Sequence, residues 1–239
     1  MPESGGAQPV AFVCAMPMEL RPLAKRLGLR RAEVGGLPLH AGALDGRPVV
    51  AVVTGMGTQL AGDGVRRLLD AVSPSRVVVV GITGAVDDET PIGHLVLPAR
   101  VVDHASGREH AHHVLGPGRG EGALWTTDVI TPAAELPALR ARGVVALDME
   151  TAAVALACEE RGVPWAVFRA VSDRATDGTV DDEVFHLSRQ DGTPDPRAVA
   201  RYLARHPSRI PRLARMGRDA TLAARRAADA AVAAVRAAG

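Results

Sequence analysis

Two carboxylates stand at the ends of two consecutive apolar segments in the second half of the chain. Glu150 follows residues 144–149, and Asp173 follows residues 165–171. Both segments are predicted to be strands, and ligands of open α/β sheets bind in the crevice at the carboxyl ends of the strands. A carboxylate at the end of a buried strand is costly unless it has a function. The alternative is that both residues cap helices. The same arrangement occurs twice, which is compatible with acid–base chemistry, and the choice between the two interpretations rests on the resemblance described below.

Two glycine loops and one acidic residue give weaker signals. Residues 54–58 (TGMGT) and 81–85 (GITGA) each follow a predicted strand, and glycine lets the backbone approach a ligand closely. Neither loop has the spacing of a known phosphate-binding motif, so a tight turn is as good an interpretation of each one alone. Glu19, in residues 15–20 (AMPMEL), is by itself explained as an acid at a helix N-terminus.

The histidines and cysteines do not predict a metal site. His110, His112 and His113 lie within four residues, but no HExxH motif or spaced carboxylate accompanies them, and glycines flank the stretch. A solvated loop is therefore the expected structure. Cys14 and Cys158 are far apart and lie inside apolar segments, as reduced core thiols do.

Strands and helices must alternate to place these residues. Short apolar, β-branched runs suit strands that are buried on both faces, and amphipathic segments lie between some of them. The expected strands are residues 10–14, 48–54, 76–82, 94–102, 124–130, 144–149 and 165–171. The expected helices are residues 18–27, 59–72 and 151–161. This alternation predicts an α/β sandwich around a mostly parallel or mixed sheet.

The last forty residues are rich in Ala and Arg and are predicted to be helical. A packing helix is favoured over a basic surface for a polyanion, because Asp219 and Asp229 interrupt the positive charge and no aromatic residues lie between the arginines. We expect a disordered tail over residues 1–9, an α/β domain over 10–188, and a helical extension over 189–239 packed on the same domain. The polar segment 175–196 is expected to be a long loop that could cover a site.

Composition excludes several classes of protein. The chain has 239 residues and a formal net charge of +1, which gives no global case for nucleic acid as a partner. No apolar run reaches the roughly 18 residues that a membrane span needs, and no secretory signal is visible. The expected location is the reducing cytoplasm.

Four segments together resemble one known family. The sequence DMETAAVALACEERGVPWAVFRAVSD, at residues 148–173, is similar to the signature region of the purine nucleoside phosphorylase/nucleosidase superfamily, and AMPMEL, TGMG and GITGA precede it in the family's order. The nearest branch is the 5′-methylthioadenosine/S-adenosylhomocysteine nucleosidases. The resemblance covers about residues 10–185 and implies a three-layer α/β/α sandwich around a mixed central sheet. After Ser188 the chain is more similar to phosphorylase-like proteins found with hopanoid biosynthesis.

The resemblance implies catalytic roles for two carboxylates. Asp173 would protonate N7 of the leaving adenine, and Glu19 would hold and activate the attacking water. Glu150 would bind the ribose 2′- and 3′-hydroxyls, and Met149 would pack against the sugar. The chemistry needs these residue types, since cleavage of an N-glycosidic bond builds positive charge on the sugar and needs an acid at the base and a base at the water.

Further positions follow from the same resemblance. Ser172 and Arg169 would support the loop that positions the acid, and Val129 and Ile130 would fall near the purine. Ile82 stands where the nucleosidases carry a small polar residue that contacts the nucleophile, and Val129 replaces an aromatic residue that stacks on the base. Both substitutions bear on the choice of substrate.

The nucleophile is predicted to be water. Superfamily phosphorylases bring an arginine to phosphate just before the second glycine loop, where this chain has four valines at residues 77–80. Phosphate binds poorly without such a cation, and Glu19 would repel it. The predicted function is hydrolysis of the N-glycosidic bond of a 5′-modified adenosine, without cofactor or metal, by a homodimer. The alternatives are a nucleoside phosphorylase, including the hopanoid-associated type, and a non-catalytic nucleoside-binding protein.

Overall fold

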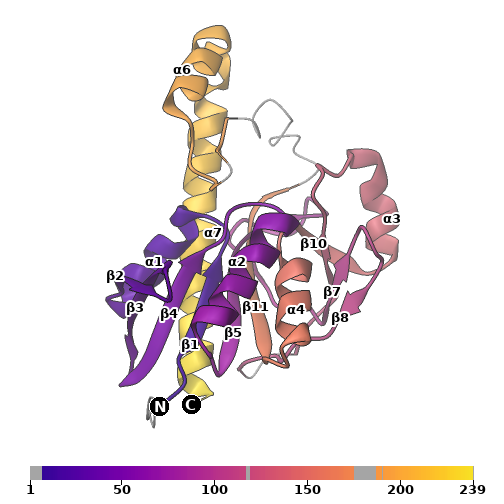
Figure 1. Cartoon of the computed structure of the whole chain (residues 1–239). Coiled ribbons are helices and arrows are strands. Elements are labelled where there is room, and N and C mark those ends of the chain that lie inside the picture. Colours follow the sequence, from indigo (N-terminus) through magenta and orange to yellow (C-terminus); the bar gives the residue numbers. More distant parts are fainter. Residues whose placement is uncertain (1–6, 117–118, 175–186, 190, 239) are drawn as a thin grey trace.

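A single mixed sheet forms the centre of the protein (Figure 1). The structure is a computed structural model that describes residues 7–116, 119–174, 187–189 and 191–238. The strands in these ranges are β1 (Val10–Cys14), β2 (Arg30–Val34), β3 (Leu37–Leu44), β4 (Arg47–Val53), β5 (Arg76–Ala85), β6 (Leu95–Val96), β7 (Arg100–Asp103), β8 (Glu109–His110), β9 (Ala123–Thr126), β10 (Val144–Asp148) and β11 (Trp165–Arg174).

Strand β5 organises the sheet and creates the edge at which side chains meet. It pairs in parallel with β1 on one side and with β11 on the other, so the carboxyl ends of these three strands lie at the same edge. The end of β5 continues past this edge and pairs in antiparallel fashion with β10, with Gly84 opposite Leu147. The end of β10 therefore returns toward the middle of the same edge.

Helices cover both faces of the sheet (Figure 1). The α-helices of the described part are α1 (Pro17–Leu27), α2 (Thr58–Ala71), α3 (Leu136–Ala141), α4 (Thr151–Glu160), α6 (Pro196–Arg205) and α7 (Ile210–Ala237). Val77 and Val79 belong to the core under α2 and α4, whereas Val78 and Val80 belong to the core under α1 and α7. The continuous valine run is thus explained by burial on both faces. The predicted three-layer α/β/α sandwich around a mixed sheet is confirmed.

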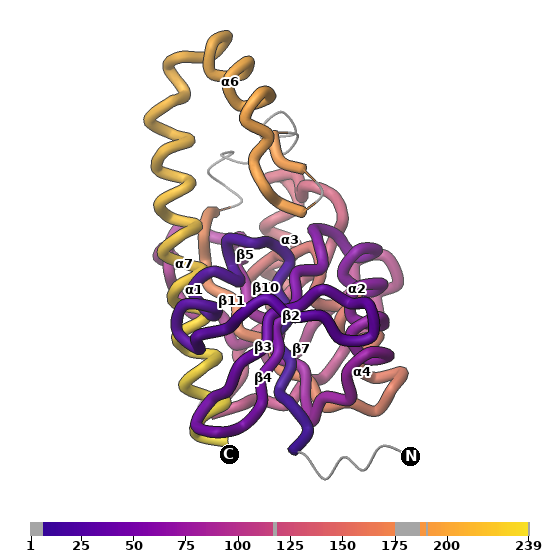
Figure 2. The backbone as a smooth tube through the Cα atoms, turned by 60° about the vertical axis from the view of Figure 1, so that its left-hand side comes forward, coloured from indigo at the N-terminus to yellow at the C-terminus, as the bar shows by residue number. Residues whose placement is uncertain are grey.

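Helix α7 is the predicted C-terminal packing helix. A stripe of small side chains that includes Ala223, Ala227 and Ala231 is fully buried, and the helix packs on β11, β5 and α1. Because alanine has so little side chain, the helix axis can approach the sheet closely. The amino-terminal half of α7 and the whole of α6 extend beyond the sheet as a hairpin (Figures 1 and 2).

Some expected elements differ from the structure. Strands β2 and β3 were not expected. β2 is an edge strand without a buried residue, and β3, which pairs with β2 and β4, has buried leucines only at Leu37, Leu39 and Leu44. The single strand expected over residues 94–102 is divided into β6 and β7, and the strand expected over 124–130 ends at Thr126. The expected tail and cover loop lie largely outside the described residues, at 1–6 and 175–186. In the described part, no helix combines the length and the apolar character that crossing a bilayer requires.

Candidate active site

Glu19 is held at the junction of β1 and β5. The chain leaves β1, turns at Ala15 and Met16, and enters α1, where Glu19 is the third residue. Its Oε2 accepts the N–H groups of Ala15 and Met16 at 2.8 and 3.0 Å, and its Oε1 accepts the N–H of Ile82 at 2.8 Å. The side chain is only 1% exposed. A carboxylate has about four acceptor positions, so one remains after these three bonds.

Arg169 connects three carboxylates in the interior of the site. One terminal nitrogen, Nη2, donates to Asp148 Oδ2 and to Glu150 Oε2, the latter at 3.1 Å. The other, Nη1, lies 3.7 Å from Glu19 Oε1 and donates to the Ile82 carbonyl at 3.2 Å. Burial alone lowers the pKa of Arg169, but the three carboxylates outweigh it and raise this pKa above its ordinary value. The guanidinium is therefore permanently charged.

Glu150 points into the site rather than capping its own helix. It occupies the N-cap position of α4 without a side-chain cap bond, whereas Asp148 Oδ2 accepts the N–H of Thr151 at 3.1 Å. Glu150 Oε1 instead accepts the N–H of Gly57, from the first glycine loop, at 3.1 Å. This loop therefore does more than make a turn, since it supplies a donor to a site carboxylate.

Burial disturbs the protonation of both glutamates. Burial raises the pKa of Glu150 to about 7; Arg169 opposes this rise, while Asp148 and Glu19 add to it. Burial also raises the pKa of Glu19, although Arg169 and the three N–H donors act in the opposite direction. Carboxylates with raised pKa values are typical of acid–base sites.

Asp173 lies at the end of β11, where the strand has a bulge. The register of β11 against β5 shifts between Val171 and Asp173, which buries Ser172 and turns Asp173 toward Gly84. The Ser172 hydroxyl donates to Asp173 Oδ1 at 2.5 Å. Bulges that redirect a side chain in this way are common beside active sites.

A small cavity of about 130 Å³ opens beside Asp173. It is lined by Gly84, Thr127, Val129, Ile130, Thr131, Leu147, Asp148, Met149, Asp173 and Arg174. Val129 is 60% exposed and Ile130 is 37% exposed, which is unusual for large apolar side chains. Such side chains on the wall of a cavity are available to contact the face of a ligand.

The structure brings the predicted residues into two adjoining groups. Glu19, Ile82, Glu150 and Arg169 form the buried polar group, in which Ile82 takes part through its backbone while its side chain packs in the core under α1 and α7. Met149, Val129, Ile130, Ser172 and Asp173 lie at or beside the cavity.

Asp148 joins the two groups, and the sequence interpretation gave it no role. It lines the cavity, binds Arg169, and accepts the Thr126 hydroxyl at 2.6 Å. The available signal was its place one residue before Met149, in the acidic pair that includes Glu150.

The histidine run is more ordered than expected. His110 lies in β8, is 2% exposed, and bonds through Nδ1 to both carboxylate oxygens of Glu159 at 3.0 Å. The expectation of a solvated loop is therefore wrong at this residue, because strand pairing and the Glu159 carboxylate allow its burial. Across the residues that the structure describes, no three His, Cys, Asp or Glu side chains group as metal ligands would.

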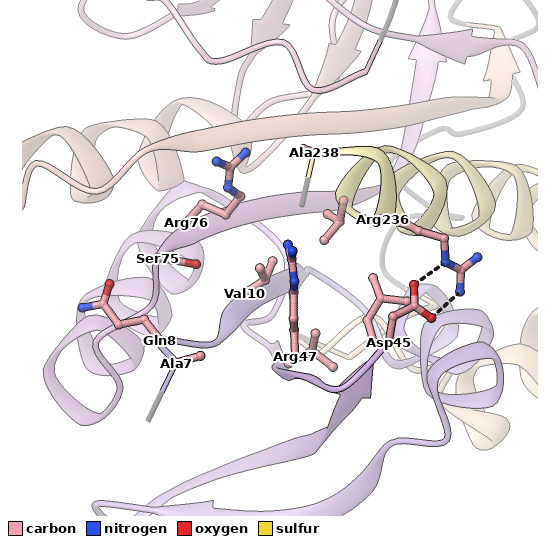
Figure 3. A pocket seen from close by; sticks show the side chains of 12 residues that line it. Ala7, Gln8, Val10, Asp45, Arg47, Ser75, Arg76, Arg236 and Ala238 are labelled. Carbon is pink, nitrogen blue, oxygen red and sulfur yellow. Dashed lines mark hydrogen bonds and ion pairs between the residues drawn. The ribbon is translucent and has the colours of Figure 1, made fainter. Parts of the chain in front are cut away.

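A larger cavity, of about 440 Å³, lies at the opposite end of the strands (Figure 3). It is lined by Val10 and Arg76, at the starts of β1 and β5, and by the ion pair of Asp45 with Arg236. It contains none of the predicted catalytic residues, so size alone does not identify the site.

The fold and the site define the class of protein. The sequence model of the phosphorylase superfamily matches residues 9–120 and 117–205, and the chain belongs to this family.

Individual relatives of the chain within this family are nucleosidases. The chain is 28% identical over 198 residues to a 5′-methylthioadenosine/S-adenosylhomocysteine nucleosidase of Chromohalobacter salexigens, a match that covers 70% of this chain and 84% of the relative. A protein of the same name from Mycobacterium bovis is 27% identical over 225 residues, a match that covers 72% of this chain and 88% of the relative.

Solved structures show the same fold. The nucleosidase of Neisseria meningitidis, in complex with methylthio-immucillin-A, superposes with a TM-score of 0.72 at 18% identity, over 96% of this chain and 99% of that one. The futalosine hydrolase of Helicobacter pylori superposes with a TM-score of 0.69 at 17% identity, over 93% of this chain and 95% of that one. The expected resemblance to the nucleosidase branch is thereby confirmed.

Proposed function

We propose that this protein hydrolyses the N-glycosidic bond of a 5′-modified adenosine, releasing adenine and a ribose derivative. The observation that carries this proposal is the fixed position of Glu19, which lies at the same sheet edge as Glu150 and Asp173. Similarity to nucleosidases of methylthioadenosine and S-adenosylhomocysteine supports these two substrates.

Each carboxylate has one role in the proposed reaction. Asp173, aligned by Ser172, protonates N7 of the departing base, and Met149, Val129 and Ile130 contact the purine and sugar. Glu150 accepts the two ribose hydroxyls. Glu19 takes a proton from the water that attacks C1′. These steps need no metal or organic cofactor.

The charge around Glu19 favours water over phosphate as the nucleophile. Val77 and Val80 are fully buried in the sheet and offer no cation, and the Arg169 guanidinium beside Glu19 is occupied by three carboxylates. A phosphate dianion there would meet net negative charge without a free bidentate partner. Hydrolysis is therefore preferred to phosphorolysis.

Three broader statements belong to the same proposal. We infer a homodimer and a cytoplasmic location; the similarity to the family supports the first, and two free, buried cysteines support a reducing compartment. Residues 10–188 form the catalytic domain, and 189–239 form its helical extension. Gel filtration with light scattering tests the dimer directly.

Base release in the presence and absence of phosphate tests the function. The enzyme is incubated with methylthioadenosine, S-adenosylhomocysteine, adenosine and inosine. We expect free adenine and a reducing sugar from the first two, at a rate independent of phosphate. Asp173→Asn and Glu19→Gln should each lose about 10²–10⁴-fold in turnover, whereas Asp45→Asn, on the surface and far from the site, should retain it. A sugar 1-phosphate product would instead establish a phosphorylase, and binding without turnover would establish a nucleoside-binding protein.

A further inference from the structure

The C-terminal hairpin has no part in the proposed reaction and little part in the core. The first buried residue of α7 is Ala220, and every residue of α7 before it is at least partly exposed. Helix α6 has one buried residue, Tyr202. The segment 196–218, called the basic hairpin below, therefore stands outside the core and projects from the body of the protein (Figures 1 and 2). Core packing explains the second half of α7 but not this segment.

The basic hairpin carries positive charge that no acidic residue interrupts. Across the whole chain the basic and acidic residues nearly balance, at 28 and 27, so this separation of charge is local. Asp219 and Asp229, which interrupt the positive charge of the tail, both follow the hairpin. A packing role is therefore favoured only for the part of α7 beyond residue 218. The hairpin contains no Asp or Glu, and its basic residues are Arg197, Arg201, Arg205, Arg209, Arg212, Arg215 and Arg218.

Helix α6 separates its arginines from its apolar residues. Arg197, Arg201 and Arg205 are four residues apart, which places them one above another on the helix, and all three are exposed. Tyr202, on the opposite face, is 5% exposed, and its hydroxyl accepts a hydrogen bond from Arg209 Nη1 at 2.9 Å. The helix thus turns its apolar face into the hairpin and its arginines toward solvent.

The turn between α6 and α7 exposes apolar side chains next to these arginines. Ile210, the first residue of α7, is 49% exposed, and Pro207 and Pro211 near it are exposed as well. Figure 2 shows this turn at the end of the hairpin that is farthest from the sheet. A surface that approaches the hairpin from outside therefore meets apolar side chains at the tip and guanidinium groups along the helices.

This distribution matches the layers of an anionic bilayer surface. Guanidinium groups bind phosphate groups well, and a basic amphipathic segment lies in the headgroup layer with its apolar side chains at the acyl boundary. Such a segment needs no bilayer-spanning length. Single-stranded nucleic acid is typically bound by exposed aromatic side chains among the basic ones, whereas the single Phe, Tyr or Trp residue of the hairpin, Tyr202, is buried. A lipid surface is thus favoured over nucleic acid.

We propose that the basic hairpin docks the protein on a membrane surface rich in anionic phospholipid, with its exposed arginines on headgroup phosphates and Ile210 at the acyl boundary. Arg212 and Arg215 line a cavity together with Ser172 and Asp173, so the hairpin rises from the active-site end of the sheet. Docking therefore turns the active-site end of the sheet toward the bilayer. The proposal goes beyond the proposed function and does not depend on it.

Sedimentation with lipid vesicles tests the role of the charge. The full chain is mixed with vesicles of phosphatidylcholine alone or of phosphatidylcholine with an equal share of phosphatidylglycerol. We expect binding to the mixed vesicles only, and a lower partition coefficient in high salt. Replacing Arg197, Arg201 and Arg205 together with Gln should lower this coefficient by about 10²-fold, since each basic residue near an anionic surface contributes about fivefold.

The matched control removes the same charge elsewhere on the surface. It replaces three exposed arginines outside the hairpin with Gln, namely Arg30 and Arg31 in β2 and Arg67 in α2, and should bind as the parent does. Equal binding by the two triple variants would overturn the proposal, because net charge alone would then explain it. Failure of the parent to bind the mixed vesicles would also overturn it, whether or not the protein then binds RNA or duplex DNA.

A fluorescent label at the tip tests which surface meets the bilayer. Cys14 and Cys158 are buried, so an introduced exposed cysteine can be labelled selectively with an environment-sensitive dye. The label on Ile210→Cys should brighten and shift to the blue when mixed vesicles are added. The control label on Val34→Cys, a residue of β2 that is 38% exposed, should not change. Binding without a change at Ile210 would overturn the proposal, since another surface would then face the lipid.

Discussion

Alanine at Gly81 should disable the site by displacing two of its charged groups at once. An ideal Cβ there would lie 2.3 Å from Glu19 Oε1 and 2.3 Å from Arg169 Nη1, whereas ordinary contacts are 3.4–4 Å. Each group would have to retreat by about 1 Å, and a misplacement of this size costs about 10²-fold in rate. Overpacking of a filled interior should also lower the free energy of unfolding by about 1–3 kcal/mol. We therefore expect a folded protein with kcat/KM reduced by about two orders of magnitude.

Adenine release and thermal unfolding measure the two effects separately. The matched control is Gly217→Ala in α7, where an added Cβ meets no atom within 4 Å. Replacing glycine in a helix should stabilise the control by about 0.5–1 kcal/mol and leave its activity unchanged. Parental kcat/KM in Gly81→Ala would refute the positions assigned to Glu19 and Arg169. A Gly81→Ala protein that is unfolded at 25 °C would refute the estimate of the packing cost.

Three further predictions concern the carboxylates and the cation that joins them. Glu150→Ala should abolish the preference of the enzyme for a ribosyl substrate over its 2′-deoxy analogue, measured as a ratio of kcat/KM; a retained preference would exclude Glu150 as the diol ligand. Arg169→Met should lower the free energy of unfolding in urea by about 3–5 kcal/mol, because it leaves buried carboxylates unpaired, whereas Arg236→Met, which breaks an exposed pair with Asp45, should cost at most about 1 kcal/mol. Glu150 has a pKa of about 7 in the folded protein, so the native state binds the Glu150 proton more tightly than the unfolded chain does. The contribution of this protonated side chain to the free energy of unfolding is therefore present below about pH 4.5 and is lost as the pH rises through 7. Urea unfolding at pH 5 and pH 8 should show this loss in the wild type and a smaller one in Glu150→Gln; identical pH dependence in the two proteins would contradict it.

The sequence located the strand ends well because the signals there are local. Val77–Val80 is too apolar for anything but a strand buried on both faces, and the structure divides its side chains between the two cores. Asp173 and Glu150 were predicted to lie at the ends of two consecutive strands because each follows an apolar run. Both do lie at one edge of the sheet, although the antiparallel pairing of β10 that brings Glu150 there was not predicted.

Long-range pairing decided what the sequence left open. Glu150 reaches Arg169 because β10 runs antiparallel to the end of β5, a register that no local pattern encodes. The role of Asp148 depends on the same pairing, since it is the partner of Arg169 only once β10 and β11 flank β5. Gly192 carries a recognisable turn signal, but nothing near it in sequence indicates that Met16 fills the space beside it.

The buried negative charges of the site destabilise the protein without substrate, but they suit a reaction that develops positive charge. Glu19, Asp148 and Glu150 surround a single guanidinium, so the group carries excess negative charge whenever more than one of the three is ionised. Burial disfavours the ionised carboxylates and raises the pKa values of Glu19 and Glu150, and for Glu150 the charges of Asp148 and Glu19 add to the rise. In the proposed reaction, cleavage of the N-glycosidic bond develops positive charge on the sugar beside these same carboxylates. An arrangement that lowers the stability of the empty site therefore stabilises the transition state more than the bound substrate, which is the condition for catalysis.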